Sequence, residues 1–221
     1  MKLFSIMLLL LSATASHAQV RTVSERSYWM AIRAAHDRNN TLPHRTVTKM
    51  ETLTEGKRKI SRKDVLEYLS SDRQKFTRTT YENGKVSTFE LIKVGTDHYC
   101  RQGDGSWVKS NTWCGPSEMY GDPASSDTKI TVELVNGDKE KAEHYRYYST
   151  YAFVNASDDR RHFTEINTWI DSQKRVTRSE SRRGVVDSDE RIFVMSEDYE
   201  YEPFKPALDI RAPTNVTQRS R

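Results

Sequence analysis

The sequence predicts an α+β fold in which an antiparallel β-sheet follows a single long helix. Three observations support this prediction. Apolar residues near the start of the chain recur at helical spacing, most of the remaining chain alternates polar and apolar residues, and tight-turn dipeptides separate several of the alternating stretches. With 221 residues, the chain is long enough for one good-sized domain, which we expect over residues 19–214.

The leading helix is predicted over residues 24–36. Tyr28, Ile32 and Ala35 fall on one stripe of this segment, and Ser24 is placed to cap its first turn. We expect the stripe to pack on the sheet, because an amphipathic helix buries its apolar face.

Strands are predicted wherever period-two alternation continues between turn signals. Asn83-Gly84 and Asp104-Gly105 are strong hairpin-turn signals, and a turn-rich stretch over 114–127 is expected to hold a short helical turn. The predicted strands are His44–Thr54, Lys63–Ser70, Gln74–Glu82, Lys85–Val94, His98–Arg101, Ser106–Lys109, Thr128–Val135, Tyr145–Val154, His162–Asp171, Lys174–Arg182 and Glu190–Ser196.

The first 18 residues have the pattern of a secretory signal peptide. Lys2 precedes an apolar run at 3–11, and small residues follow up to Ala18, after which cleavage is expected. An uncleaved anchor helix is the other interpretation, but a span needs about 20 apolar residues. The mature chain is therefore expected to have no transmembrane segment and to be periplasmic or secreted. At the other end, the composition of residues 215–221 predicts a disordered tail.

Cys100 and Cys114 are the only two cysteines, and both lie in the part expected to be exported. In an oxidising compartment such a pair is most simply a disulfide, which stabilises by about 3 kcal/mol for a loop of this size. A metal pair or a reactive thiol is the alternative. His98 is the nearby residue of ligand type, which is too few ligands for a metal site.

The sequence contains no local pattern for catalysis, and we expect a non-catalytic protein without cofactor or metal. The histidines form no His-x-x-x-His pair, and no Gly-x-Ser-x-Gly motif occurs. Charged residues make up 30% of the chain and alternate in sign, which is typical of a solvated sheet face and speaks against nucleic-acid binding. The tyrosine-rich run at 144–151 fits either strand packing or a stacking platform. Asn-x-Ser/Thr patterns begin at Asn39, Asn155 and Asn215, and they matter only in a eukaryotic secretory pathway.

The order of several landmarks resembles the LolA lipoprotein carriers and the mycobacterial LppX and LprG lipid-binding lipoproteins. The landmarks are Asp72-Arg73, Ile92 to Gly95, Tyr99 to Trp107, Trp169-Ile170-Asp171, Tyr199 to Tyr201 and Ile210 to Pro213. This resemblance implies a strongly curved antiparallel sheet, an unclosed half-barrel wrapped over the N-terminal helix and short helical turns. Its concave face would receive acyl chains.

The resemblance implies a carrier or binding protein for a lipid or for the acyl group of a lipoprotein. A sensory or structural module of the same fold, which binds an envelope protein partner, is the alternative. The candidate ligand face consists of apolar residues that take one side of each strand, and joining the strands into one surface follows from the resembled fold. These residues are Phe76, Phe89, Leu91, Ile166, Ile170, Ile192 and Val194. A closed core under the helix is the other interpretation of the same seven residues.

Overall fold

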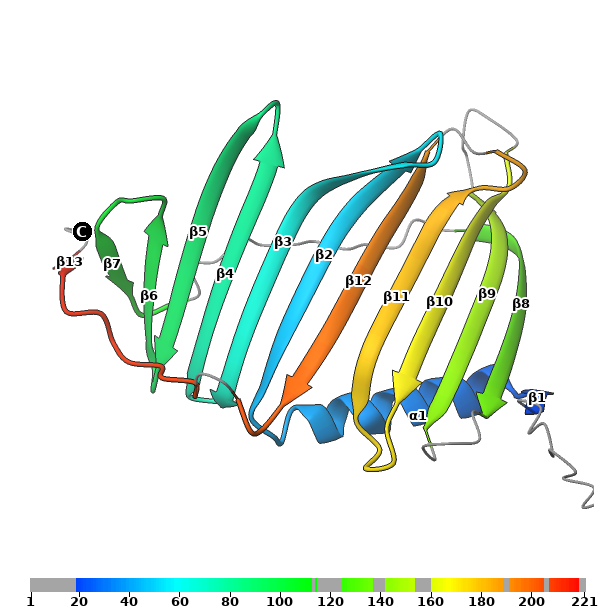
Figure 1. Ribbon diagram of the computed structural model, residues 1–221, viewed down its shortest axis with the longest axis horizontal. Helices are drawn as coiled ribbons and strands as arrows, with labels where there is room; N and C mark the ends of the chain where they lie inside the picture. Colours follow the sequence, from blue (N-terminus) through cyan, green and yellow to red (C-terminus); the bar gives the residue numbers. More distant parts are fainter. Residues whose placement is uncertain are drawn as a thin grey trace, which may run out of the picture.

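The computed structural model describes residues 19–112, 114, 125–136, 142–153, 160–188, 191–204 and 207–218. Within them, 13 strands form one curved sheet, and one helix packs against a single side of it (Figure 1). The predicted α+β class and the unclosed, curved sheet are therefore confirmed. The signal peptide predicted at 1–18 and the helical turn expected within 114–127 lie outside the described residues.

The helix α1 spans Glu25–Asn39. The strands are β1 (Gln19–Thr22), β2 (His44–Thr54), β3 (Lys57–Ser70), β4 (Arg73–Glu82), β5 (Lys85–Val94), β6 (Asp97–Gln102), β7 (Trp107–Ser110), β8 (Ser125–Asn136), β9 (Glu143–Phe153), β10 (His162–Ile170), β11 (Val176–Val185), β12 (Ile192–Tyr201) and β13 (Val216–Gln218).

The sheet runs in the order β1-β8-β9-β10-β11-β12-β2-β3-β4-β5-β6-β7-β13. The first long strand, β2, pairs with the last long strand, β12, in the middle of the sheet. Each described pairing is antiparallel except that of β13 with β7. Strands β1 and β13 lie at opposite edges and do not pair, which leaves the sheet open (Figure 1).

Helix α1 forms where the sequence predicts it and is one turn longer. The Ser24 side chain accepts a hydrogen bond from the backbone N–H of Ser27 at 3.1 Å, which caps the first turn. The buried stripe of the helix ends at the polar residue Asn39. Its side-chain oxygen accepts a hydrogen bond from the backbone N–H of Val176 in β11 at 3.1 Å, and its side-chain nitrogen donates to the Val176 carbonyl at 3.3 Å. This pair of bonds fixes the end of the helix to the sheet and buries the side chain of one Asn-x-Thr pattern.

The concave face, on the side of α1, changes in character across the sheet. Directly opposed residues on neighbouring antiparallel strands point to the same side, so the register identifies rows that share a face. One row of the concave face consists of Tyr145, Thr168, Ser179, Glu197, Thr48, Asp64, Arg78 and Phe89. It starts with a ring under the helix, passes through hydroxyl groups and reaches charged side chains where the helix no longer covers the sheet.

The main core lies between α1 and strands β8 to β11. Its buried residues are Tyr28, Ile32, Ala35, Val132, Leu134, Tyr145, Tyr147, Ile170 and Val176. The predicted helix stripe is thus confirmed, because its three residues are at most 8% exposed and belong to this cluster. Burial of large aromatic rings lets a polar chain form a core from few residues.

The convex face is a lattice of charged pairs, as expected for the solvated side of the sheet. Arg45 in β2 contacts Glu67 at 3.0 Å on one neighbouring strand and Glu200 at 3.1 Å on the other. His144 and Trp169 stack with their ring centroids 4.5 Å apart. A smaller apolar cluster also lies on this side, where Ile92 and Tyr99 pack with Ile210.

The predicted hairpin at Asn83-Gly84 joins β4 to β5. Both residues have positive φ, 49° and 74°, as a two-residue turn of this kind requires. The predicted disulfide is also confirmed: Cys100 in β6 is bonded to Cys114, with Cα atoms 6.3 Å apart.

Several strand boundaries differ from the prediction by a few residues, and some differences are larger. Strands β3 and β12 extend beyond the predicted 63–70 and 190–196, because their polar ends pair with β2 along its whole length. Strand β1 was not predicted. The prediction of a disordered tail is wrong for Val216–Gln218, which pairs with β7, and Val216 packs against the convex apolar cluster.

Candidate ligand pocket between the helix and the sheet

A cavity of about 670 Å³ lies between the first half of α1 and the concave face of β9 to β12. Its volume falls within the range of roughly 300 to 1,000 Å³ that is usual for small-molecule sites. The cavity is lined by Trp29, Thr128, Tyr147, Ser149, Tyr151, Phe153, Arg160, His162, Thr164, Ile166, Arg183, Gly184, Val185, Ser188, Arg191 and Phe193. Strands β9 and β10 supply most of its floor, since their concave residues alternate with convex ones.

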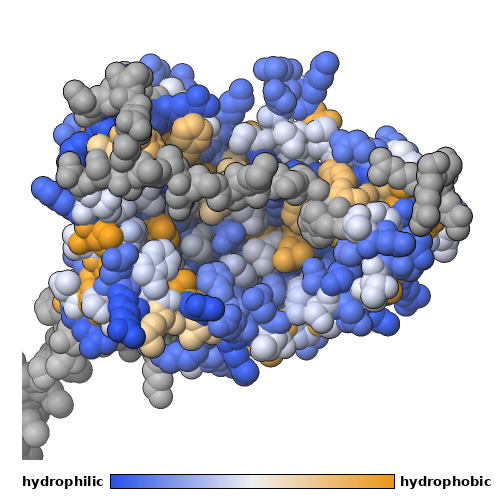
Figure 2. Space-filling view, turned by 180° about the vertical axis from the view of Figure 1, so that it is seen from behind, coloured by the Kyte–Doolittle hydropathy of each residue, from blue (hydrophilic) through white to orange (hydrophobic). Residues whose placement is uncertain are grey.

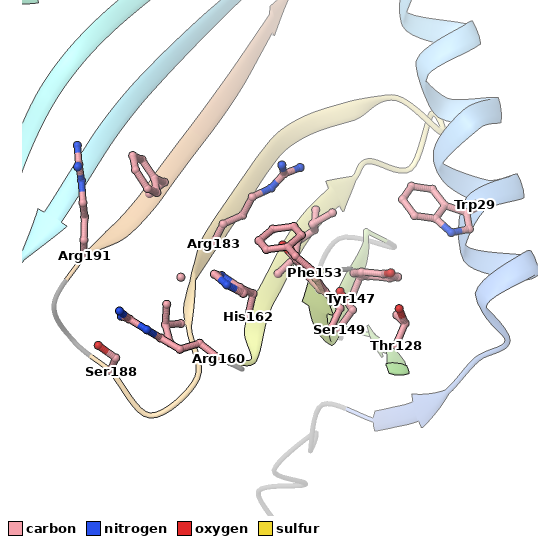
Figure 3. Close-up of a pocket in the computed structure, with 16 residues that line it drawn as sticks. Trp29, Thr128, Tyr147, Ser149, Phe153, Arg160, His162, Arg183, Ser188 and Arg191 are labelled. Carbon is pink, nitrogen blue, oxygen red and sulfur yellow. The ribbon is translucent and has the colours of Figure 1, made fainter. Parts of the chain in front are cut away.

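One end of the cavity is aromatic. Trp29 projects from α1 toward the sheet, and its ring centroid lies 5.5 Å from that of Tyr147 (Figure 3). The indole N–H donates to Glu25 on the same helix at 3.0 Å, so the polar atom of Trp29 is satisfied without the pocket. Tyr147 also stacks on Tyr28 of the core, with centroids 5.4 Å apart. Contact with the main core therefore fixes the position of the Tyr147 ring at this end of the cavity.

A second aromatic group continues along the floor. Phe153 lies 5.3 Å from Tyr151 and 4.5 Å from His162, measured between ring centroids. The Tyr151 hydroxyl and the Thr164 hydroxyl lie 3.5 Å apart. These residues give the cavity apolar faces with hydroxyl groups at intervals, which suits an elongated apolar ligand.

The opposite end is cationic. Arg160 and Arg191 lie on the side of the cavity away from Trp29, and Arg183 lies between them and the aromatic end (Figure 3). The guanidinium carbon of Arg191 sits 4.8 Å from the ring centre of Phe193. No carboxylate occurs among the lining residues that the structure describes, and within the same parts of the chain neither Arg183 nor Arg191 has an ion-pair partner. The described lining is thus apolar at one end and positively charged at the other.

The phenol groups next to the aromatic end stay uncharged at neutral pH. Burial raises the pKa of Tyr147, and it raises the pKa values of Tyr28 and Tyr145 to about 12. The tyrosine wall under the helix therefore carries no charge that would repel or attract an ion, and the formal charge of the lining comes from its arginines.

The structure separates the seven predicted ligand-face residues into three places. Ile166 lines the cavity, and Ile170, 2% exposed, belongs to the closed core below the helix. Phe76, Phe89 and Leu91 lie together on the concave side of the β4–β5 hairpin, where Phe76 is opposed to Leu91 in the register, and none of them lines the cavity.

The placement of Ile192 and Val194 on that common surface is wrong. Val194 is opposed to Arg182, and Arg182 is opposed to Glu165, so this row lies on the convex face. The two residues are nevertheless buried, at 8% and 3% exposure. The concave residue that β12 gives to the cavity is Phe193, which lies between them in the sequence.

Most of the cavity residues were not predicted from the sequence, although the tyrosine-rich run at 144–151 gave one signal. The alternation in the tyrosine-rich run puts Tyr145, Tyr147, Ser149 and Tyr151 on one face, and the structure confirms that parity, with the intervening Tyr148 exposed. Strand packing, one of the two interpretations of the run, is confirmed for Tyr145 and Tyr147, which belong to the core, and Tyr147 also lines the cavity. The arginines gave no local signal.

The described residues contain no group of three or more His, Cys, Asp or Glu side chains placed to hold a metal ion. In the same part of the chain, no helix has the length and apolar character needed to cross a membrane.

Comparison with known proteins gives little beyond the chain itself. No family model matches, and no curated protein matches the sequence. Among solved structures, the chain is similar to the crystal structure of a DUF1329 family protein from Desulfovibrio piger, with 12% identity and a TM-score of 0.30 over 80% of this chain and 92% of that chain. The resemblance to the LolA, LppX and LprG proteins stays a prediction from the sequence landmarks.

Proposed function

We propose that this protein is a non-catalytic binding or carrier protein for an acyl-bearing ligand, a lipid or the acyl group of a lipoprotein. In this proposal the acyl chain occupies the cavity between α1 and strands β9 to β12. The observation that carries the proposal is the cavity lining, in which Trp29, Tyr147 and Phe153 face a space of about 670 Å³ (Figure 3).

The energetics of acyl burial suit such a site. Each methylene group removed from water contributes about 0.8 kcal/mol, so a chain that is only partly enclosed still binds. Trp29 and Met30 of α1 are apolar and exposed, at 45% and 63%. Apolar side chains are scattered among polar ones over the face of the molecule shown in Figure 2. The predicted signal peptide and the disulfide fit a protein that works in an oxidising, exported compartment.

The test is uptake of a dansyl-labelled fatty acid by the mature protein. We expect saturable binding, and we expect Ile166→Trp to reduce it, because the larger ring fills part of the cavity. Val86→Trp is the matched control, since Val86 is 64% exposed on β5 and outside the cavity. Thermal unfolding of each variant shows whether it is folded. Absence of saturable uptake by the unmodified protein would reject the proposal in favour of a partner-binding module.

A further inference from the structure

The cavity is uncharged at one end and lined by arginines toward the other. Its aromatic end is uncharged, whereas three arginines line the remainder and none of the lining residues that the structure describes is a carboxylate. Arg183 belongs to β11, Arg191 immediately precedes β12, and Arg160 precedes β10, so separate strands bring positive charge to one side of the cavity.

We propose that the cavity binds a single-chain amphiphile with an anionic headgroup, a carboxylate or a phosphate, in one orientation. The headgroup lies at Arg183 and Arg191, and the acyl tail lies against Trp29 and Tyr147. This inference rests on the proposed function and adds the headgroup chemistry and the direction of the ligand.

The chemistry of the arginine side chains favours an oxyanion. A guanidinium group donates several N–H bonds in one plane, which matches the spacing of carboxylate and phosphate oxygens. Arg191 lies over the ring of Phe193 at 4.8 Å, a contact that orders the long side chain without consuming its charge. Arg183 is exposed on the concave side and has no ion-pair partner among the described residues. Its charge is therefore not neutralised by a described carboxylate, and the side chain lines the cavity.

The neighbour of Arg183 shows what a satisfied arginine looks like on the same strand. Arg182 points to the convex face and contacts Glu165 on β10 at 3.5 Å. Adjacent residues of β11 thus share a residue type and backbone environment but face opposite sides of the sheet. Arg182 is the matched control for Arg183.

The experiment compares probes with the same alkyl tail and different headgroups in displacing the dansyl-labelled fatty acid. The probes are dodecanoate, dodecyl phosphate, dodecanol and dodecylamine, each below its micelle concentration. We expect both anions to bind more tightly than the alcohol, and the amine to bind most weakly. The ratio of dodecanoate to dodecyl phosphate affinity identifies which oxyanion the arginines prefer. Asp158, Asp159, Asp189 and Glu190 flank two of the arginines in sequence, and preference for the amine would show that the site is net negative.

Substitutions of single arginines test which of them causes the preference for an anionic headgroup. Arg183→Gln and Arg191→Gln are each expected to weaken dodecanoate binding by roughly tenfold, the equivalent of one charge-assisted hydrogen bond, and to leave dodecanol binding unchanged. Arg182→Gln is expected to change neither. Equal loss of dodecanoate and dodecanol affinity in Arg183→Gln would overturn the headgroup assignment.

Orientation is read from tryptophan fluorescence. A fatty acid brominated at the end of its tail should quench Trp29, and the quenching should fall in Trp29→Phe, whereas bromination beside the carboxylate should quench Trp29 weakly. The reverse pattern would overturn the direction. If the alcohol binds as tightly as the anions, the inference fails while the acyl-binding proposal stands. If no alkyl probe binds, the proposed function itself fails.

Discussion

The two halves of the concave face are stabilised in different ways. In the helix half, formed by α1 with β8 to β11, tyrosine and aliphatic side chains pack into a closed core. In the ion-pair half, formed by β2 to β5, a buried carboxylate takes that central place. Arg78 donates to Asp64 from two nitrogens at 3.0 and 2.8 Å, and Arg62 contacts Asp64 at 3.2 Å. The adjoining strand β6 carries the disulfide through Cys100, which is opposed to Leu91.

This difference shows why the cavity lies where it does. Apolar side chains on a sheet need a cover, and α1 contacts mainly β8 and β11, so the main apolar core extends only over β8 to β11. Tyr147 marks the limit of the helix half, since it contacts the helix on one side and the cavity on the other. Beyond the cover, the concave face combines the hydrogen-bonded charges around Asp64 with the separate apolar group on β4 and β5. The cavity therefore opens beside the core, and the ion-pair half lies outside it.

The largest expected effect tests the helix half. Ile32→Asp should lower the free energy of unfolding by about 4 kcal/mol, because it places an unpaired charge in a core where Ile32 is 8% exposed. Urea denaturation measures the change. Met30 lies on the same helix and is 63% exposed, so Met30→Asp should lower the free energy of unfolding by less than about 1 kcal/mol. Similar midpoints for the two variants would show that α1 does not stabilise the sheet through this stripe.

The next effect tests the ion-pair half. Asp64→Ala should cost about 3 kcal/mol, because it removes the carboxylate that binds two partly buried guanidinium groups. Glu51→Ala is the control, since its partner Arg58 is 60% exposed and such pairs contribute roughly 0 to 1 kcal/mol. Both are measured by urea denaturation. If Asp64→Ala costs no more than Glu51→Ala, the buried charge is not what stabilises this half.

The same contrast explains how much of the molecule the sequence could predict. The helix stripe, the Asn83-Gly84 turn and the disulfide depend on residues close in sequence, and all three were predicted. Burial of Asp64 was not, because alternating charge on a strand indicates a solvated face unless the opposite strand is known. Parity within a strand can be read from local sequence, but the face it takes is set by its partners.

The register between strands could not be predicted from the sequence. Bulges between Met50 and Glu51 and between Trp169 and Ile170 shift the pairing by one residue, and a shift of one moves side chains to the other face. Val194 shows why register matters: it is 3% exposed, but its pairing with Arg182 places it on the convex face and not on the predicted ligand face. The cavity combines residues from α1 and five strands, so no local pattern could have assembled it.

The smallest expected effect is a pH dependence specific to the helix half. Burial raises the pKa of Tyr28, 1% exposed, from 10.0 to about 12, an effect that a hydrogen bond with Thr168 opposes. A raised pKa in the folded state means that this state favours the neutral phenol. The resulting stabilisation is complete below pH 10 and is lost as the pH rises from 10 to about 12. Two pKa units correspond to about 2 to 3 kcal/mol, which is an upper limit for one residue.

Tyr28→Phe keeps the ring and removes the ionisable group, so its stability should fall about 2 kcal/mol less than that of the unmodified protein over this range. Urea denaturation of both proteins at neutral pH and at the alkaline limit gives the difference, in which the titration of all other groups cancels. Parallel pH profiles would mean that the Tyr28 phenol ionises as readily in the folded protein as in the unfolded chain, and that the core under the helix admits water.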